Sequence, residues 1–197
     1  GATLTPARRA FSRRQNCENY EANQAFTPAT VSAPRTVAEV VTVVEGARSA
    51  STTLRAVGGC AAMSNADATK GHLIHTYQLM NAKPEKLNKT LTGDLAGKHI
   101  YWLGAAASIN KVVDALAALE PSLAMPNLGG WMGQTVIGAI MPGPHGSGIK
   151  SPPLCDFAHA IHYVAGDGKQ YIIQKAAGPL EDDDMPDGAT LVSDDDE

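Results

Sequence analysis

Two long stretches with few bulky side chains constrain the fold of this chain more than any other feature of its sequence. The first, "GGCAAMSNADAT" (58–69), follows an apolar run at 54–57 and holds a single charge, Asp67. The second, residues 123–148, contains seven glycines in 26 residues. Loops this long without regular structure are usually functional, and glycine lets main-chain N–H groups approach a ligand closely. The two stretches together predict a long ligand held against main chain between two lobes.

The length and the apolar content allow a substantial hydrophobic core. A chain of 197 residues, 44% of them apolar, suits one ordinary domain or two small lobes that share an interface. It has no apolar run long enough to predict a membrane-spanning helix and no pattern of a signal peptide. A secreted protein whose signal has been removed would show the same pattern. The location therefore stays open between the cytoplasm and the outside of the cell.

The net charge of −4 comes from the last 19 residues. Residues 179–197 hold nine acids and no base, which leaves eleven acids against sixteen bases, a net charge of +5, for residues 1–178. An acidic stretch of this kind predicts a disordered tail. The mildly basic remainder suits a small anionic ligand. Its bases are too few and too scattered for nucleic acid, apart from "RRAFSRR" at 8–14.

The periodicity of apolar residues predicts short strands. Single strands are expected at 29–33, 53–57 and 72–77, and a hairpin at 86–104 turns around residues 93–97. A second hairpin is expected at 159–174, with Asp167 and Gly168 as its turn.

Three helices are predicted between these strands. One lies at 5–14, with Thr5 as its N-cap and Pro6 at its first helical position. Another opens on a capping box at 36–39 and buries a face listed as Val37, Val40, Val41, Val44 and Ala47. The third is capped by Ser108 and buries a face listed as Ile109, Val112, Val113, Leu116 and Leu119. Residues 121–153 show little periodicity.

This order of elements predicts an α+β fold with two α/β subdomains. The expected divisions are an N-terminal helix and lead-in at 1–25, a first subdomain at 26–84, a second at 85–178 and the acidic tail at 179–197.

The first glycine stretch alone does not identify a ligand. It follows a strand, as phosphate-binding loops do, but its spacing is not G-x-G-x-x-G, no helix pattern follows at once, and the P-loop pattern is absent. By itself, this stretch is better explained as a tight turn.

Seven motifs in order carry a resemblance to a known family. They are "P-x-T-V-x-E-V-V" (34–41), "L-R-A-V-G-G" (54–59), "G-A-A-A-S-I" (104–109), "L-A-M-P-N-L-G" (123–129), "Q-T-V-I-G-A-I" (134–140), "G-P-H-G-S-G" (143–148) and "G-D-G" (166–168). In this order the chain resembles the FAD-binding domain of the vanillyl-alcohol oxidase superfamily, over about residues 16–175. The sugar-lactone and alditol oxidase branch is the most similar, because of "P-N-L-G" and "H-G-S-G".

The resemblance implies a PCMH-type FAD-binding fold, with FAD between the two subdomains. The loop at 56–62 would wrap the pyrophosphate with its N–H groups, residues of the second glycine stretch would line the other side, and His145 and Gly146 would lie near the flavin. Ile161 or Tyr163 would contact the adenine or ribose. The cofactor-binding residues so implied are Ala56, Val57, Gly58, Gly59, Cys60, Ala61, Ala62, Gly130, Thr135, Gly138, Ala139, Met141, Pro142, His145, Gly146 and Ile161.

The chain departs from the family at the position of covalent flavin attachment. Many members have a His-Ser pair where this chain has Ala61 and Ala62, so FAD is expected to bind non-covalently. Some related enzymes attach the flavin through a cysteine. Cys60 is one position away from that attachment site, so no covalent link through it is expected. Pro142 and Pro144 also remove two N–H donors from a loop whose role is to donate.

Family enzymes continue into a substrate-binding cap, and this chain shows no equivalent. The first hypothesis is the FAD domain of an oxidase or dehydrogenase that oxidises a CH–OH group of a polyol, sugar lactone or similar alcohol by hydride transfer to flavin N5. A second chain or a missing segment would carry the cap, and the catalytic residues stay unknown. The alternatives are a non-catalytic flavin- or nucleotide-binding module, or a cofactor-free interaction protein of the same fold. No nucleic-acid or membrane partner is expected.

The remaining candidate sites are weaker. His72 and His75, like His159 and His162, are three apart on predicted strands and therefore point to opposite faces, so no metal site is predicted. The three cysteines, Cys17, Cys60 and Cys155, are widely spaced and form neither a disulfide framework nor a zinc pattern.

Overall fold

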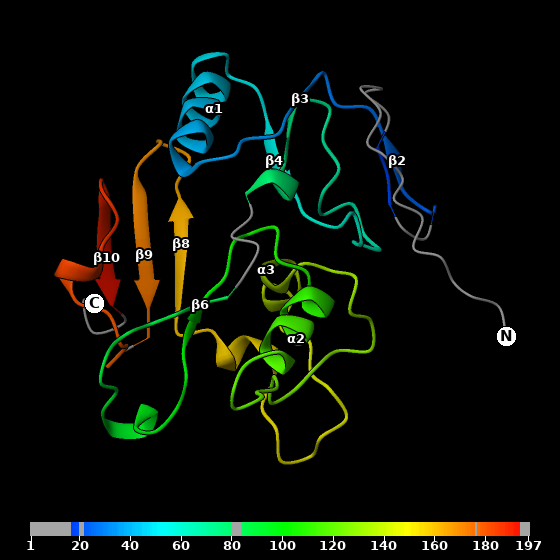
Figure 1. Ribbon diagram of the computed structural model, residues 1–197. Helices are drawn as coiled ribbons and strands as arrows, with labels where there is room; N and C mark the ends of the chain where they lie inside the picture. The colour runs from blue at the N-terminus through cyan, green and yellow to red at the C-terminus, as the bar shows by residue number, and fades with distance from the viewer. Residues whose placement is uncertain (1–16, 20–21, 80–83, 176, 194–197) are drawn as a thin grey trace, which may run out of the picture.

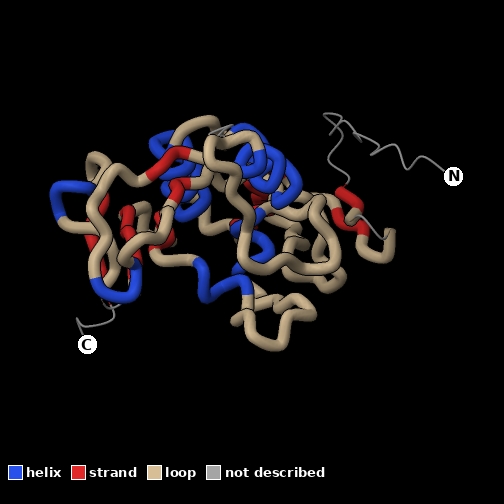
Figure 2. The backbone as a smooth tube through the Cα atoms, turned by 60° about the horizontal axis from the view of Figure 1, so that its bottom comes forward, coloured by secondary structure: helices blue, strands red, loops and turns tan. Residues whose placement is uncertain are grey.

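The computed structural model describes residues 17–19, 22–79, 84–175 and 177–193. Short helices and strands are joined by long loops, which make up much of the backbone in Figure 2. Two sheets of three strands form the framework: β3-β5-β4 near the N-terminus and β10-β9-β8 near the C-terminus. The helix predicted at 5–14 lies outside the described residues. No helix in the described ranges is both long and apolar enough to cross a membrane.

The first sheet is parallel. β3 (Thr30–Ser32) and β4 (Leu54–Val57) both pair with β5 (His72–His75), which lies between them. All three strands were predicted, although β5 is shorter than expected because η1 (Thr76–Gln78) replaces its end. Val57 and Leu73 are buried in a small core with Cys60 and Phe26. A two-stranded pair, β1 (Cys17–Glu18) with β2 (Ala25–Phe26), precedes this sheet.

Helix α1 (Val37–Ser49) joins β3 to β4, as predicted. The Thr36 hydroxyl accepts a hydrogen bond from the Glu39 N–H, as the capping box requires. The Glu39 carboxylate accepts from the Arg35 N–H instead of from Thr36, at 2.8 Å. Val44 and Ala47 are buried and the other predicted core valines are half-buried. The helix lies across one end of β8 (Figure 1).

The second sheet forms around the predicted hairpin. β8 (Ala160–Val164) and β9 (Gln170–Gln174) are antiparallel, and Gly168 adopts the left-handed φ of +87° that their turn requires. The hairpin predicted at 86–104 is confirmed as an antiparallel pair, but its strands β6 (Glu85–Lys86) and β7 (Tyr101–Trp102) are only two residues long. A one-turn helix, η2 (Gly93–Leu95), lies within it.

The second core lies around α2 (Ile109–Ala117) and α3 (Val136–Ile140), on the other side of the molecule from α1 (Figure 1). The predicted face of α2 is confirmed, since Ile109, Val112 and Leu116 are buried. Ser108 begins the helix without a side-chain cap; its hydroxyl donates to the Asn110 side-chain oxygen Oδ1 at 2.6 Å. Helix α3 is a regular element within 121–153, where little periodicity was found. The helical turn η3 (Leu154–Phe157) packs beside α3.

The prediction of a disordered tail from residue 179 is wrong for the described part of that segment. β10 (Ala189–Ser193) pairs in parallel with β9, and η4 (Asp182–Asp184) precedes it. Leu180 is buried, and its N–H and carbonyl oxygen both bond to the Gln174 amide. The acidic composition predicted disorder because it does not show these contacts, which hold the segment on the second sheet. The subdomain boundaries at 26–84 and 85–178 stay predictions.

We expect Thr36→Ala to lower the free energy of unfolding by about 1 kcal/mol, because it removes the acceptor for an N–H at the start of α1. Thr42→Ala is the matched control. The Thr42 hydroxyl bonds to the Ala38 carbonyl oxygen inside the same helix, so its loss should leave stability unchanged or slightly higher. Urea unfolding of both variants checks this. Equal losses in the two would contradict the capping role.

Candidate functional site

The two glycine stretches meet at the carboxyl end of β4. A Cβ on Gly58 would lie 2.6 Å from the Thr135 hydroxyl oxygen and 2.9 Å from its methyl group. A Cβ on Gly59 would lie 3.3 Å from the Gly133 carbonyl oxygen. Glycine is therefore needed at residue 58 for the second stretch to pack against the first. This packing explains in part why the residues that follow Val57 have small side chains or none.

The turn after Gly58 presents main-chain donors. The N–H groups of Gly59, Ala61 and Ala62 donate no hydrogen bond to any acceptor in the described ranges. Cys60 has a left-handed φ of +50°, and the Ala62 carbonyl oxygen accepts a 2.7 Å bond from the Asn19 amide, which holds the turn from outside. Gly59 is exposed, and Ala61 and Ala62 are half-buried. Ala61 and Ala62 are adjacent, and adjacent free N–H groups in such a turn form a concave site for an anion.

Thr135 is a buried junction between the two stretches. Its hydroxyl accepts from the Gly138 N–H at 3.2 Å and so caps α3, while its backbone bridges to Ser108. A Cβ on Gly138 would lie 2.8 Å from the same hydroxyl. Gly130, by contrast, faces open space.

Two predicted cofactor residues have side chains in the cores. Val57 is 4% exposed in the first core, and Ala139 is fully buried in the second. If either binds a ligand, it must do so through its main chain. Ala56, on β4, and Pro142, after α3, are both exposed.

The remaining predicted residues lie farther along the chain. His145 is exposed, and its Nδ1 lies 3.0 Å from the Gly146 carbonyl oxygen. Gly146 packs against the Asn127 side-chain oxygen and the Leu128 carbonyl oxygen, so a Cβ would not fit there. Ile161 is half-buried on β8, in the second sheet, opposite Ile173. The structure brings residues 58 and 59 against 133–135 but shows no contact that joins Ile161 to them.

Large apolar side chains are exposed on both glycine stretches, and among them sequence reasoning missed Met63 and Met132. Met63 is 70% exposed on the first, and Met141 is 73% exposed on the second, where Trp131 and Met132 are exposed as well. Gly133 was also missed, although a Cβ there would overlap the Trp131 ring. The pattern G-G-W-M-G was the signal for it. Exposed apolar groups beside free N–H donors are typical of a ligand site.

Two buried polar side chains belong to the first sheet and the first stretch: His75 on β5 and Asp67 in the stretch itself. His75 is 5% exposed, and burial lowers its pKa to about 4. Its ring packs edge-on against Tyr77 and its Nδ1 accepts from the Tyr77 N–H. Among the described residues no hydrogen-bond partner reaches the buried carboxyl oxygens of Asp67, and burial raises the pKa of that carboxyl. No group of three metal-ligating side chains lies close together in the described ranges.

Comparison with known proteins identifies the fold. A family model described as an FAD binding domain matches residues 28–174. Cholesterol oxidase from Brevibacterium sterolicum matches with a TM-score of 0.56 and 20% identity, over 68% of this chain and 24% of that one. A histidine-to-alanine mutant of the same enzyme matches with a TM-score of 0.54 and 22% identity, over the same shares. Chitooligosaccharide oxidase matches with a TM-score of 0.59 and 17% identity, over 76% of this chain and 30% of that one.

These structural matches establish the PCMH-type FAD-binding fold that was predicted. The chain spans only about a quarter to a third of the length of the matched structures. A search of curated protein sequences finds no significant match.

We expect Gly58→Ala to be strongly destabilising, by roughly 1–3 kcal/mol, because its Cβ overlaps Thr135. Adding Thr135→Ala should cost less in the Gly58→Ala background than in the wild type, since it removes the overlapping atoms. Gly130→Ala, in open space, is the control and should leave stability nearly unchanged. A double-mutant cycle by chemical unfolding measures the coupling. Additive losses would contradict the packing.

We expect the free energy of unfolding to fall as the pH drops from 6.5 toward 4. The unfolded chain then protonates His75 while the folded chain keeps it neutral, a loss of up to about 3 kcal/mol. Above pH 6.5 His75 is neutral in both the folded and the unfolded chain, so it no longer makes the free energy of unfolding depend on pH. His75→Gln should flatten the slope in this window, and His99→Gln at an exposed site should not. Unfolding curves at several pH values check this; an unchanged slope in His75→Gln would contradict it.

Proposed function

Because the chain belongs to the FAD-binding domain family, we propose that it binds FAD between the two glycine stretches as part of a flavin-dependent oxidoreductase. The free N–H groups of Gly59, Ala61 and Ala62 are the observation that carries this proposal. They follow a parallel strand and stand beside a second stretch that approaches within van der Waals distance.

The residues present fit the cofactor. A pyrophosphate needs several converging donors and close approach to the backbone. Gly59, Ala61 and Ala62 offer free N–H groups in a turn with no side chain larger than a thiol. Cys60 is buried in the core, so its side chain leaves the turn open. The exposed Met63, Met132 and Met141 supply apolar surface for the ring systems.

We propose that the cofactor is held non-covalently. The methyl group of Ala61 stands where many relatives carry the histidine that links to flavin, and a methyl group forms no such bond. The neighbouring thiol of Cys60 is buried on the other side of the turn.

The proposed reaction is oxidation of a CH–OH group in a polyol, sugar lactone or similar alcohol. When bound, FAD supplies a hydride acceptor at N5. The chain's own residues bind the pyrophosphate at 59–62, orient the cofactor between the loops and present His145 from an exposed segment. The names of the structural neighbours, cholesterol oxidase and chitooligosaccharide oxidase, support an alcohol-oxidising class, and "P-N-L-G" with "H-G-S-G" favours the sugar-lactone and alditol branch.

Substrate contacts are proposed to come from a cap carried by a further segment or a second chain. The matched structures are three to four times longer than the part that this chain covers, which supports this division. The proposal assigns no catalytic base within the chain.

The first test is the visible absorbance of the purified chain, before and after acid precipitation. We expect a flavin spectrum that moves entirely into the supernatant. Colour that stays in the pellet would overturn the non-covalent mode and make Cys60 the residue to replace next. A chain that stays colourless after FAD is added would overturn the proposal and favour a cofactor-free interaction protein.

A charge variant tests the loop itself. Ala61→Asp places a carboxylate beside the proposed pyrophosphate and should weaken FAD binding by about tenfold or more. Ala66→Asp adds the same charge at an exposed position of the same stretch and should bind FAD like the wild type. Flavin fluorescence titration measures both affinities, and thermal unfolding of the apo forms confirms their folding. Equal affinities would place the cofactor elsewhere.

A further inference from the structure

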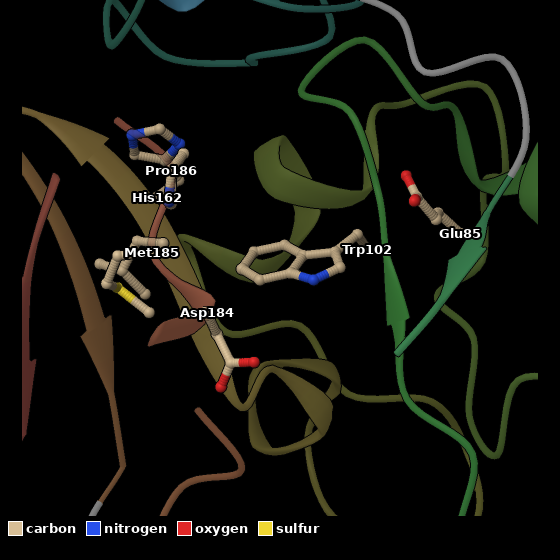
Figure 3. A pocket seen from close by; sticks show the side chains of 7 residues that line it. Glu85, Trp102, His162, Asp184, Met185 and Pro186 are labelled. Atoms are coloured by element: carbon tan, nitrogen blue, oxygen red, sulfur yellow. The ribbon is translucent and has the colours of Figure 1, made fainter. Parts of the chain in front are cut away.

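A cavity of about 330 Å³ lies between the β6–β7 pair and the segment that leads into β10. Glu85 of β6 and Trp102 of β7 form one wall, and Asp184, Met185 and Pro186 form the other. The Trp102 indole projects across the cavity toward the side of Met185 and Asp184 (Figure 3).

The floor of the cavity is the second sheet. His162 of β8 and Ile172 of β9 close it, and the His162 Nε2 lies 3.2 Å from the Gln170 amide oxygen. None of the residues predicted to bind FAD is among those that line the cavity. The wall at 184–186 also lies outside residues 28–174, the part that matches the family model. The cavity therefore combines the family domain with a segment that the family model does not cover.

The second wall is held in place by a short ion-pair network. Lys89, from the loop after β6, contacts Asp184 at 2.7 Å and Glu181 at 2.9 Å. The Glu181 N–H donates to the same Asp184 carboxylate at 2.8 Å. These hydrogen bonds lower the pKa of Asp184, with Lys89 as the larger cause, so the carboxylate is ionised at neutral pH.

The charge around the cavity is negative. Lys89 offsets Asp184, but no Lys or Arg of the described ranges pairs with Glu85, and Asp182, Asp183 and Asp187 lie in the same short wall segment. The rest of the lining is apolar or aromatic apart from the polar imidazole of His162, whose Nε2 is engaged by the Gln170 amide oxygen. An indole face beside carboxylates attracts an organic cation through the ring quadrupole and direct charge, whereas an anion would be repelled.

We propose that this cavity binds a small organic cation of the alkylammonium class. The charged nitrogen lies against Trp102 within reach of Glu85 and Asp184, and the alkyl part contacts Met185 and Pro186. The volume is at the lower end of that of known ligand sites, which suits a molecule the size of choline rather than a nucleotide.

The test is a titration of the full ¹⁵N-labelled chain with choline, followed through the indole N–H signals. The chain has two tryptophans, so Trp131→Phe assigns the Trp102 signal. We expect choline to shift the Trp102 signal saturably. Its neutral carbon analogue, 3,3-dimethylbutan-1-ol, should bind roughly tenfold more weakly because it lacks the charge.

Glu85→Gln should weaken choline binding about fivefold or more without affecting folding, because Glu85 forms no ion pair with any residue that the structure describes. Glu120→Gln, at an exposed site after α2, is the matched control and should bind like the wild type. Three results would each overturn the proposal: no saturable shift with choline, equal affinity for the neutral analogue, or an unchanged affinity in Glu85→Gln.

Discussion

The close approach of Thr135 to Gly58 is the contact on which the site depends. Thr135 fills the space where any other residue at 58 would place its Cβ. The same side chain caps α3, and its backbone bridges to the start of α2. One threonine thus ties the end of the parallel sheet to the helical core. A larger residue at 58 would separate the two stretches that the proposed function needs to keep together.

This packing leaves the main chain of the first stretch available. Val57 and Ala139 turn their side chains into different cores, and Cys60 is buried with Val57. The turn between Gly59 and Ala62 then carries only the small side chains of Ala61 and Ala62 outside the core, and Gly59 is exposed. The N–H groups of Gly59, Ala61 and Ala62 have no acceptor among the described residues, which is why the proposed function assigns them to the cofactor's pyrophosphate.

The segment after β9 packs on the second sheet and forms one wall of the cavity described above. The Gln174 side chain bonds to the N–H and the carbonyl oxygen of Leu180, and Lys89 forms ion pairs with Glu181 and Asp184. These contacts hold the acidic segment against the domain that the family model matches. Each contact is modest, and exposed ion pairs contribute little alone. Together with the five-residue pairing of β10 on β9, they create the wall of a cavity that the domain would otherwise lack.

The amino-acid sequence by itself determined what depends on neighbours in the chain. Thr36 caps α1, Asp167 and Gly168 turn the β8–β9 hairpin, and the apolar spacing of α2 sets its buried face, because each rests on local geometry. The order of seven loose motifs was also enough to predict the family and its cofactor. Helix α3 is too short to show a period, and β10 lies in a stretch whose charge predicts disorder. Only the tertiary structure decided that Gly58 meets Thr135 and that Lys89 holds Asp184, because such contacts join residues far apart in sequence and depend on the whole path of the chain.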